Sequence, residues 1–443
     1  MRVPAAPPAF DVGAFLNASD VQRAADQARD LEGYPHWDKV RRLRFVDEVS
    51  PEVVWGALQM TRRMQARPLP LRQVDGSAFY YTLPDVLLQT LQGIASQASG
   101  QVAMPGQVVS GETRDRYVVR SLMEEAITSS QLEGASTAHR VAKELLRSGR
   151  EPRDVSERMI ANNYRAMKWV QENSDDEITP EAILALHAIV TSGTLSDPGQ
   201  EGRLQRPDEP RVGVWSNLDD IQLHHPPSAD ELPDRLDELC RFANADGPWM
   251  PMLLRAIVCH FMVGYDHYFA DGNGRLARVL FYWVALREGA WLLEFTPISR
   301  ILNDAPVKYA RSYLETETDG GDVTYFALYQ ASVISRSIRE LHAYLERKTT
   351  EQEKVRLLLP VHDLNHRQRA IVEGALRDST LVLTVQSHAA SHQVSNPTAR
   401  ADLRVLEKLG YLEPGGKRRR QESWREGPRL RESRLSAERH PKL

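Results

Sequence analysis

Cysteine is almost absent from this sequence, which holds only Cys240 and Cys259 in 443 residues. Two thiols without a second pair of cysteine or histidine ligands nearby cannot form a structural zinc site. Each lies in an apolar stretch with helical periodicity, which predicts buried free thiols. This cysteine usage fits a reducing compartment and favours a cytoplasmic location.

Long hydrophobic runs are also missing. The longest strongly apolar run, residues 279–286, is far too short to cross a bilayer. The first 15 residues contain three prolines and lack the apolar core of a secretory signal. We therefore expect neither a signal peptide nor a membrane partner.

No charge of one sign dominates, since 56 Lys and Arg stand against 60 Asp and Glu, for a net charge of −4. Hydrophobic residues make up 42% and charged residues 26%, which excludes collagen-like, low-complexity and membrane classes. From residue 417 onwards, however, ten basic residues outnumber four acidic ones. At roughly 100–200 residues per domain, the length predicts two to four domains.

Apolar residues recur with the helical period along most of the chain, which predicts an all-α fold class. Residues 202–226 differ, because short apolar runs flank a turn there and predict a β-hairpin. Residues 68–81 are expected to be extended or looped. The chain then divides into five expected parts: a helical N-terminal region (1–105), a main helical domain with the hairpin (106–347), a charged linker (348–363), a unit of three short helices (364–420) and a basic, disordered tail (421–443).

The most informative stretch is a loop at residues 267–278, HYFADGNGRLAR, between two apolar helical segments. Gly272 and Gly274 let the backbone form an amide nest at a helix N-terminus, where free N–H groups and the helix dipole favour an anion. Arg275 and Arg278 are one helical turn apart and can reach the same anion. The stretch therefore predicts a polyphosphate cradle.

Two further residues of this loop supply chemistry. Asp271 is a hard oxygen ligand beside the cradle and predicts a Mg²⁺ site. His267 has an ordinary pKa of about 6.5, which suits a proton acceptor near neutral pH. A structural Gly-Asn-Gly turn would need neither residue, so the combination favours a functional site over a simple turn.

This string resembles the signature of Fic-domain proteins, in which His-Pro-Phe precedes an acidic residue, Gly-Asn-Gly-Arg and a second Arg three positions on. Its one departure is Tyr268, where the family usually has Pro. The similarity extends over residues 115–347. It implies a Fic-type helical core that transfers AMP from ATP to a Ser, Thr or Tyr hydroxyl of an unknown target protein, with Mg²⁺ as the cofactor.

The resemblance also implies a role for each matching residue. His267 would deprotonate the attacking hydroxyl, and Asp271 would hold Mg²⁺ against the α- and β-phosphates. The other matching positions would bind phosphate oxygens: Gly272, Asn273, Gly274, Arg275 and Arg278.

The hairpin at 211–224 matches in position the family's target-docking flap. Its first strand would contain Val212, Gly213, Val214 and Trp215, and an exposed strand edge can pair with an extended target segment. The alternative interpretation is a hairpin that only covers the core.

Ser129, Glu133 and Gly134 match the family's inhibitory motif at the end of a helix expected over 115–134. In relatives of this class the glutamate pairs with the second signature arginine, here Arg278, and repels the γ-phosphate. The alternative is an ordinary surface glutamate before a glycine cap. The resemblance implies a self-inhibited enzyme, and because related brakes are tuned by self-association, a homo-oligomer is a further expectation.

Residues 364–420 resemble a winged helix, with a recognition helix at 397–409 and a wing after Gly415 and Gly416. Arg400 and Arg404 would share one face of that helix. Such domains contact DNA phosphates or dock on proteins, and the sequence leaves both kinds of partner open.

Two other functions stay open from the sequence alone. The same site can remove AMP from a modified protein, with Glu133 orienting a water molecule. Alternatively, the protein is a DNA-binding regulator whose Fic core senses nucleotide, although such a sensor would not need His267. Other conspicuous residues receive structural interpretations: His260 as a packed core histidine, and Glu315, Glu317 and Asp319 as a solvated helix end.

Overall fold

The computed structural model describes residues 3–9, 13, 15, 20–98, 111–215, 221–358, 364–377, 381–392, 394–418 and 421–432. These residues form mostly helices, with small sheets of two, two and three strands. The predicted all-α fold class with small hairpins is confirmed. The chain divides into two compact units, residues 1–341 and 342–443.

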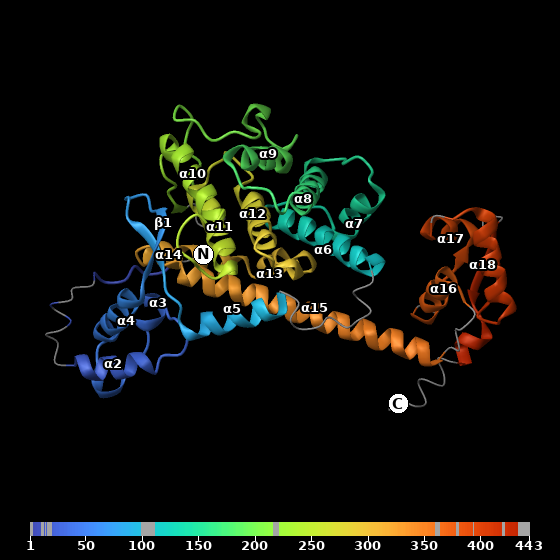
Figure 1. Ribbon diagram of the computed structural model, residues 1–443, viewed down its shortest axis with the longest axis horizontal. Helices are drawn as coiled ribbons and strands as arrows, with labels where there is room; N and C mark the ends of the chain where they lie inside the picture. Colours follow the sequence, from blue (N-terminus) through green and yellow to red (C-terminus); the bar gives the residue numbers. More distant parts are fainter. Residues whose placement is uncertain are drawn as a thin grey trace. The chain divides into compact units, whose positions relative to one another are not determined.

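The centre of the first unit is a pair of helices, α11 (Met252–Asp266) and α12 (Asn273–Arg287), that run side by side (Figure 1). Leu280, Phe281 and Trp283 of α12 expose at most 1% of their surface. A helix that is apolar on nearly all sides must be enclosed by others. The surrounding helices are α6 (Gly111–Leu132), α8 (Val155–Glu172), α9 (Pro180–Thr191) and α10 (Leu232–Ala243).

Several of these helices begin at side-chain caps that the sequence announces. Ser50, Asp154 and Thr179 each accept a hydrogen bond from an N–H three residues on, at 3.4, 2.8 and 3.2 Å. Pro51 and Pro180 follow two of the caps, at a position where an N–H would be unsatisfied anyway. The starts of α4 (Pro51–Gln65), α8 and α9 are therefore fixed locally.

Both cysteines are buried free thiols, as predicted. Burial raises the pKa of the Cys240 thiol to about 12, so it stays protonated at neutral pH. Among the residues that the structure describes, no helix is long and apolar enough to span a bilayer.

The N-terminal region lies in the same compact unit as the helical core. Residues 68–81 form more structure than expected, because β1 (Arg67–Arg72) and β2 (Ala78–Tyr81) pair as an antiparallel hairpin. The alternation of Leu69 and Leu71 with prolines in β1 directs the leucines into the core. The other helices of this region are α2 (Val21–Arg29), α3 (Trp37–Val40) and α5 (Asp85–Ala98).

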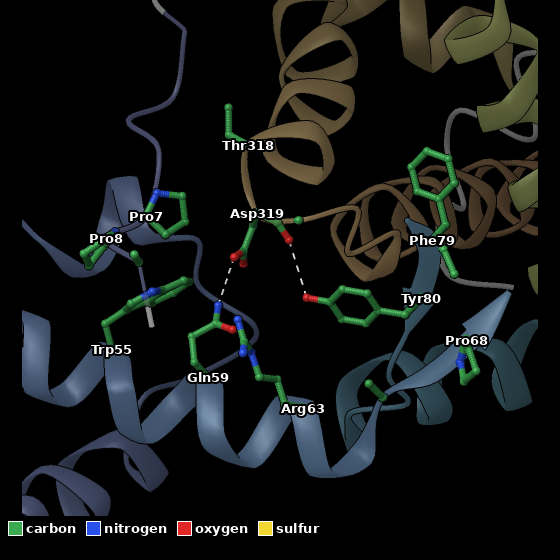
Figure 2. Close-up of a pocket in the computed structure, with 14 residues that line it drawn as sticks. Pro7, Pro8, Trp55, Gln59, Arg63, Pro68, Phe79, Tyr80, Thr318 and Asp319 are labelled. Atoms are coloured by element: carbon green, nitrogen blue, oxygen red, sulfur yellow. Dashed lines mark hydrogen bonds between the residues drawn. The ribbon is translucent and has the colours of Figure 1, made fainter. Parts of the chain in front are cut away.

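The acidic run near the end of α14 (Pro306–Thr318) is not a freely solvated helix end, so that expectation is wrong: Asp319 is buried, and Glu315 and Glu317 are partly buried. Figure 2 shows Asp319 bonded to Gln59 beside a cavity of about 470 Å³ that both residues line, with Gln59 Nε2 donating to Asp319 Oδ1 at 2.9 Å. Tyr325 donates to Asp319 Oδ2 at 2.7 Å, and the Arg62 guanidinium lies 3.8 Å from the same oxygen. Gln59 and Asp319 are 260 residues apart, so local sequence could not reveal the pairing. The other two acids of the run are also paired: Glu315 with Arg311, and Glu317 with His224.

The boundary between the two units falls inside α15 (Thr324–Leu358). The expected linker at 348–363 is therefore helical as far as Leu358, while residues 359–363 lie outside the described part. Glu, Lys and Arg are good helix formers, so a charged composition does not prevent a helix here. The remaining helices of the first unit are α7 (His139–Ser148) and α13 (Ser299–Asp304).

After the end of α15, the described residues of the second unit form three helices and a small sheet with strand order β5-β7-β6. The disordered tail expected from residue 421 is wrong for residues 421–432, since β7 pairs with β6, and Trp424 and Leu430 are 2% and 0% exposed. The many Arg and Glu residues concealed these two core residues, and residues 433–443 lie outside the described part. The elements are α16 (His366–Arg377), β5 (Leu383–Thr384), α17 (Val385–His392), α18 (Asn396–Lys408), β6 (Leu412–Arg418) and β7 (Gln421–Glu426).

Candidate active site

The loop between α11 and α12 has left-handed backbone at both ends. His267 has φ 50° and ψ 54°, and Gly272 has φ 85°. The Asn273 side chain closes the loop, because Oδ1 accepts from Phe269 N at 3.0 Å and Nδ2 donates to Phe269 O at 2.7 Å. Asn273 is 3% exposed and its amide shapes the loop, while the phosphate contact implied for it stays a prediction.

The first turn of α12 is open to an anion. The N-cap residue of α12 is Gly272, which has no side chain to cap the helix, and the N–H groups and helix dipole there favour negative charge. Asp271 borders the opening, with its side chain 61% exposed and Oδ1 accepting from Gly272 N at 2.5 Å. The predicted metal ligand and the predicted cradle are thus adjacent.

The donor set fits a magnesium ion that is shared with phosphates. Within the described residues, no group of three His, Cys, Asp or Glu side chains is arranged to hold a metal by itself. Mg²⁺ commonly takes one or two carboxylates and completes its shell with water and substrate phosphates. The single exposed carboxylate of Asp271 meets that requirement.

Arg275 and Arg278 are almost fully buried, at 0% and 1% exposure. Arg275 Nη1 donates to Val190 O at 3.1 Å, and Arg275 Nη2 lies 3.7 Å from Asp271 Oδ1 in an ion pair without a hydrogen bond. Arg275 Nε and Nη2 and Arg278 Nη1 have no hydrogen-bond partner among the described residues. Burial lowers the pKa of Arg275 below its ordinary value. Buried donors without partners are uncommon and costly, so these guanidiniums are prepared for an anionic ligand.

Glu133 reaches this anion site from the end of α6. Its Oε1 accepts from Arg278 Nη2 at 2.8 Å, while Arg278 Nε donates to Ser129 Oγ at 2.8 Å. A Cβ atom at Gly274 would lie only 2.2 Å from Glu133 Oε1, so the carboxylate rests against the first turn of α12. Gly134 follows with φ 92°, as a helix-ending glycine should. The structure thus brings Ser129 and Glu133 into contact with Arg278, while Gly134 ends the helix behind them.

The imidazole of His267 is held in its neutral form. Burial lowers the pKa of His267 to about 4, so the ring is neutral at physiological pH. Nδ1 lies 3.3 Å from the Gly264 carbonyl oxygen, which favours the tautomer with hydrogen on Nδ1. The lone pair on Nε2 is then available.

Tyr268, the departure from the family pattern, is fully buried. Its hydroxyl donates to Asp266 Oδ2 at 2.7 Å, and Arg235 Nη1 donates to Asp266 Oδ1 at 3.1 Å. Burial raises the pKa of Asp266 to about 6. A buried hydrogen-bond network therefore fixes the backbone next to His267 where relatives have a proline.

No sequence pattern singles out His187 of α9, which supports the end of the loop that carries Asp271. Its ring stacks on Phe269 with centroids 3.7 Å apart, accepts from Gly202 N at 3.0 Å and lies 2.8 Å from the Asp271 carbonyl oxygen. Accepting at Nδ1 places the proton on Nε2, which donates to Asp271 O. A single histidine in an apolar helix carries no signal that would distinguish this role from core packing.

The predicted hairpin consists of β3 (Val214–Trp215) and β4 (Gln222–His224), paired in antiparallel fashion. Trp215 is 53% exposed, while Val212, Gly213 and Val214 are half-buried. Residues 216–220 lie outside the described part. The sequence analysis did not single out Arg211, which joins the base of this hairpin to the loop.

His260 is a core histidine, as predicted, since it is fully buried and its Nε2 lies 2.7 Å from the Tyr309 hydroxyl. Burial lowers the pKa of His260 well below its ordinary value. Its place is structural.

Comparison with known proteins agrees with this site. Residues 177–285, which include the loop, match the model of the Fic/DOC family. The protein adenylyltransferase Fic of Nematostella vectensis is 30% identical over 146 residues, which cover 30% of this chain and 32% of that protein. The chain thus spans about a third of the length of this curated relative.

Two solved structures share the fold. A Fic family protein from Desulfovibrio desulfuricans aligns with a TM-score of 0.50 and 17% identity, over 79% of this chain and 98% of that one. A fragment of Fic-1 from C. elegans with a Glu-to-Gly substitution aligns with a TM-score of 0.52 and 16% identity, over 76% and 91%. The family match shows that this chain contains a Fic/DOC-family domain at residues 177–285, and the two structures show that the fold around it is shared.

Proposed function

We propose that this protein transfers AMP from ATP to a Ser, Thr or Tyr hydroxyl of a protein. The observation that carries the proposal is the pair of buried guanidiniums, Arg275 and Arg278. They belong to the first turns of α12, which directly follows the loop with neutral His267, and three of their nitrogens have no hydrogen-bond partner among the described residues. The family match and the named adenylyltransferase relative support the same reaction class.

The reaction can be written from these residues. His267 Nε2 takes the proton of the attacking hydroxyl as its oxygen bonds to the α-phosphorus. The bond between the α-phosphorus and the bridging oxygen breaks, and pyrophosphate leaves with the electron pair. Arg275 and Arg278 would hold the β- and γ-phosphates. Mg²⁺ on Asp271, when bound, neutralises phosphate charge. Such catalysis rests on positioning and charge stabilisation.

We also propose that Glu133 inhibits this reaction. Its carboxylate accepts a hydrogen bond from Arg278 and lies against Gly274. A γ-phosphate in the proposed position would need the same guanidinium and the same space. Two negative groups beside one guanidinium repel each other in a poorly solvated site. ATP bound in the presence of Glu133 would therefore be displaced from the in-line arrangement.

The test is mass analysis of protein after incubation with labelled ATP and Mg²⁺. The Glu133→Gly variant should gain an AMP adduct, the wild type should show little, and the double variant with His267→Ala should show none. Glu151→Gly, an exposed glutamate in a loop, serves as the matched control. No gain in Glu133→Gly would refute the inhibition, and equal labelling without His267 would refute the assigned base.

The same arrangement suits the reverse reaction, since Glu133 next to the cradle could orient a water molecule for removal of AMP. Incubation of the AMP-modified protein with wild type and with Glu133→Gly separates the two directions. If the wild type removes AMP and Glu133→Gly does not, the chain with Glu133 in place catalyses AMP removal.

A second candidate function belongs to the second unit. The helix and hairpin order of residues 364–426 supports the winged-helix interpretation, and Arg400 and Arg404 project from α18 with 61% and 58% of their side chains exposed. We propose that this face contacts DNA phosphates. The affinity of the full chain for duplex DNA should fall as the salt concentration rises. The double variant Arg400→Gln, Arg404→Gln should bind more weakly, and the slope of log affinity against log salt concentration should become shallower by about 2. No DNA binding at low salt would leave protein docking as the role of this unit.

A further inference from the structure

The base of the flap is tied to the loop that carries His267. Arg211 lies directly before flap residues 212–215, and its guanidinium points to the end of α11. Nη1 donates to His267 O at 2.8 Å, Nη2 donates to Asp266 O, and Nε donates to Pro227 O at 2.8 Å. One planar group therefore joins both ends of the flap to the residue assigned as the base.

The partners of Arg211 are all neutral oxygens. Burial lowers the pKa of Arg211 to about 10, so the side chain remains charged at neutral pH. The carbonyls of Asp266 and His267 lie at the C-terminus of α11, where the helix dipole concentrates negative partial charge and favours a cation. Gln205 Oε1 also accepts from Arg211, and Gln205 N donates to Tyr268 O at 3.0 Å. The guanidinium thus stabilises the end of α11 and the start of the loop together.

The backbone at His267 needs such support. A φ of 50° is uncommon for a residue with a Cβ atom, and it persists only where the surroundings hold it. His267 N donates to Val263 O at 3.2 Å, which fixes the preceding peptide, and Arg211 fixes the following one through the His267 carbonyl. The ring itself has one long contact, at 3.3 Å to Gly264 O. Backbone contacts therefore determine where Nε2 points.

We propose that Arg211 is a positioning residue for His267, which sets the placement of Nε2 relative to the hydroxyl that the flap presents. This inference rests on the proposed transfer reaction. The later part of the loop, at Phe269 and Asp271, is held by other side chains, those of Asn273 and His187. Arg211 should therefore affect proton transfer and leave ATP binding unchanged.

The second strand of the flap has a separate attachment. His224 Nε2 lies 2.6 Å from Tyr265 O, and His224 Nδ1 lies 2.7 Å from Glu317 Oε2. Shortening Arg211 would therefore leave the flap attached while releasing the fork contacts. Arg211→Lys is the suitable change, because lysine keeps the charge but lacks the planar fork that serves four acceptors.

The kinetic experiment uses the Glu133→Gly chain as parent and follows pyrophosphate release from ATP. With Arg211→Lys added, kcat should fall about 10- to 100-fold, the size of effect expected for a misplaced group, while KM for ATP stays within twofold. Arg206→Lys, an exposed arginine in the same segment, should match the parent. An unchanged kcat, or a loss that resides in KM, would overturn the proposal.

A second experiment does not depend on turnover. In the otherwise wild-type full chain, His267 is probed by its ring carbon NMR signal across pH and by its rate of carbethoxylation, read by peptide mass. Arg211→Lys should raise the pKa of His267 toward 6.5 and speed its modification at least threefold, and Arg206→Lys should do neither. If the Glu133→Gly parent does not turn over ATP, the proposed function fails, and these readings still decide whether Arg211 holds His267.

A milder variant covers the case in which Arg211→Lys does not fold. Gln205→Leu removes one acceptor of the guanidinium and leaves the other three. It should shift the His267 readings in the same direction by a smaller amount, with an unchanged affinity for ATP in calorimetry. A folded Gln205→Leu chain with the His267 pKa and modification rate of the wild type would contradict the proposal.

Discussion

A histidine that is buried in its neutral form makes stability depend on pH, and His36 is such a residue. It is 3% exposed, and burial, with Arg311 and Arg62 nearby, lowers its pKa to about 4. The unfolded chain takes up this proton below about pH 6.5 and the folded chain only near pH 4. Stability from His36 is therefore present above pH 6.5 and lost as the pH falls toward 4.

The matching experiment compares urea unfolding at pH 7 and pH 5. From the pKa difference, His36 accounts for about 2 kcal/mol of the loss in unfolding free energy over this interval. The His36→Gln variant should have a pH 7 to pH 5 difference smaller than that of wild type by about this amount. His225→Gln, at an exposed histidine, should retain the wild-type difference. Equal differences in all three chains would show that His36 does not titrate as described.

The sequence predicted the site residues whose chemistry lies in one short motif. His267, Asp271 and the two arginines are close because a single loop carries them. Sequence did not reveal His187, which supports that loop across 84 residues, or Arg211, which does so across 56. Both side chains bond to backbone carbonyl oxygens. Every residue has such an oxygen, so the sequence does not indicate which one is bonded.

At the scale of elements, the contact between α4 and the residue after α14 is the one most open to test. Asp319→Ala would leave the Arg62 guanidinium buried without its carboxylate, since the two side chains are 7% and 5% exposed. Removing one partner of a buried pair costs about 3–5 kcal/mol. The free energy of unfolding from urea titrations should fall by that amount.

An exposed pair provides the control for this change. Asp304 lies 3.4 Å from Arg336, with side-chain exposures of 51% and 47%. Surface pairs contribute roughly 0–1 kcal/mol, so Asp304→Ala should be nearly neutral. Comparable losses in the two variants would mean that the contact between α4 and Asp319 is no stronger than a surface pair.

Helices were predictable as elements, and the departures have specific causes. Capped starts such as Pro51 and Pro180 depend on neighbouring residues alone, so the pattern suffices. The β1–β2 hairpin was expected only as extended chain, because prolines in β1 interrupt the usual strand composition. The polar sequence of β7 predicts a disordered tail, because nothing in it indicates the hydrogen bonds that its partner strand β6 supplies.

At the scale of the whole chain, the main cores of the two units are separate, which predicts two unfolding transitions. The large core surrounds α11 and α12, while the small one gathers Ile371, Leu403, Leu406 and Trp424, and the two share no residue. Trp424→Ala removes a 2% exposed side chain whose Nε1 donates to Glu407 at 2.8 Å. A large-to-small change of this kind costs about 3–5 kcal/mol, so in calorimetry it should lower one transition and leave the other in place.

ATP should raise the temperature of the other unfolding transition, that of the first unit. A ligand that binds only the folded first unit stabilises it by about 2.7 kcal/mol at a concentration 100 times Kd, whatever happens in the second unit. In the full chain with ATP and Mg²⁺, the transition insensitive to Trp424→Ala should rise and the sensitive one should stay. A single transition that responds to both changes would mean that the units unfold as one. The proposed nucleotide site and the small core would then be coupled, and nucleotide binding would be read out along the whole chain.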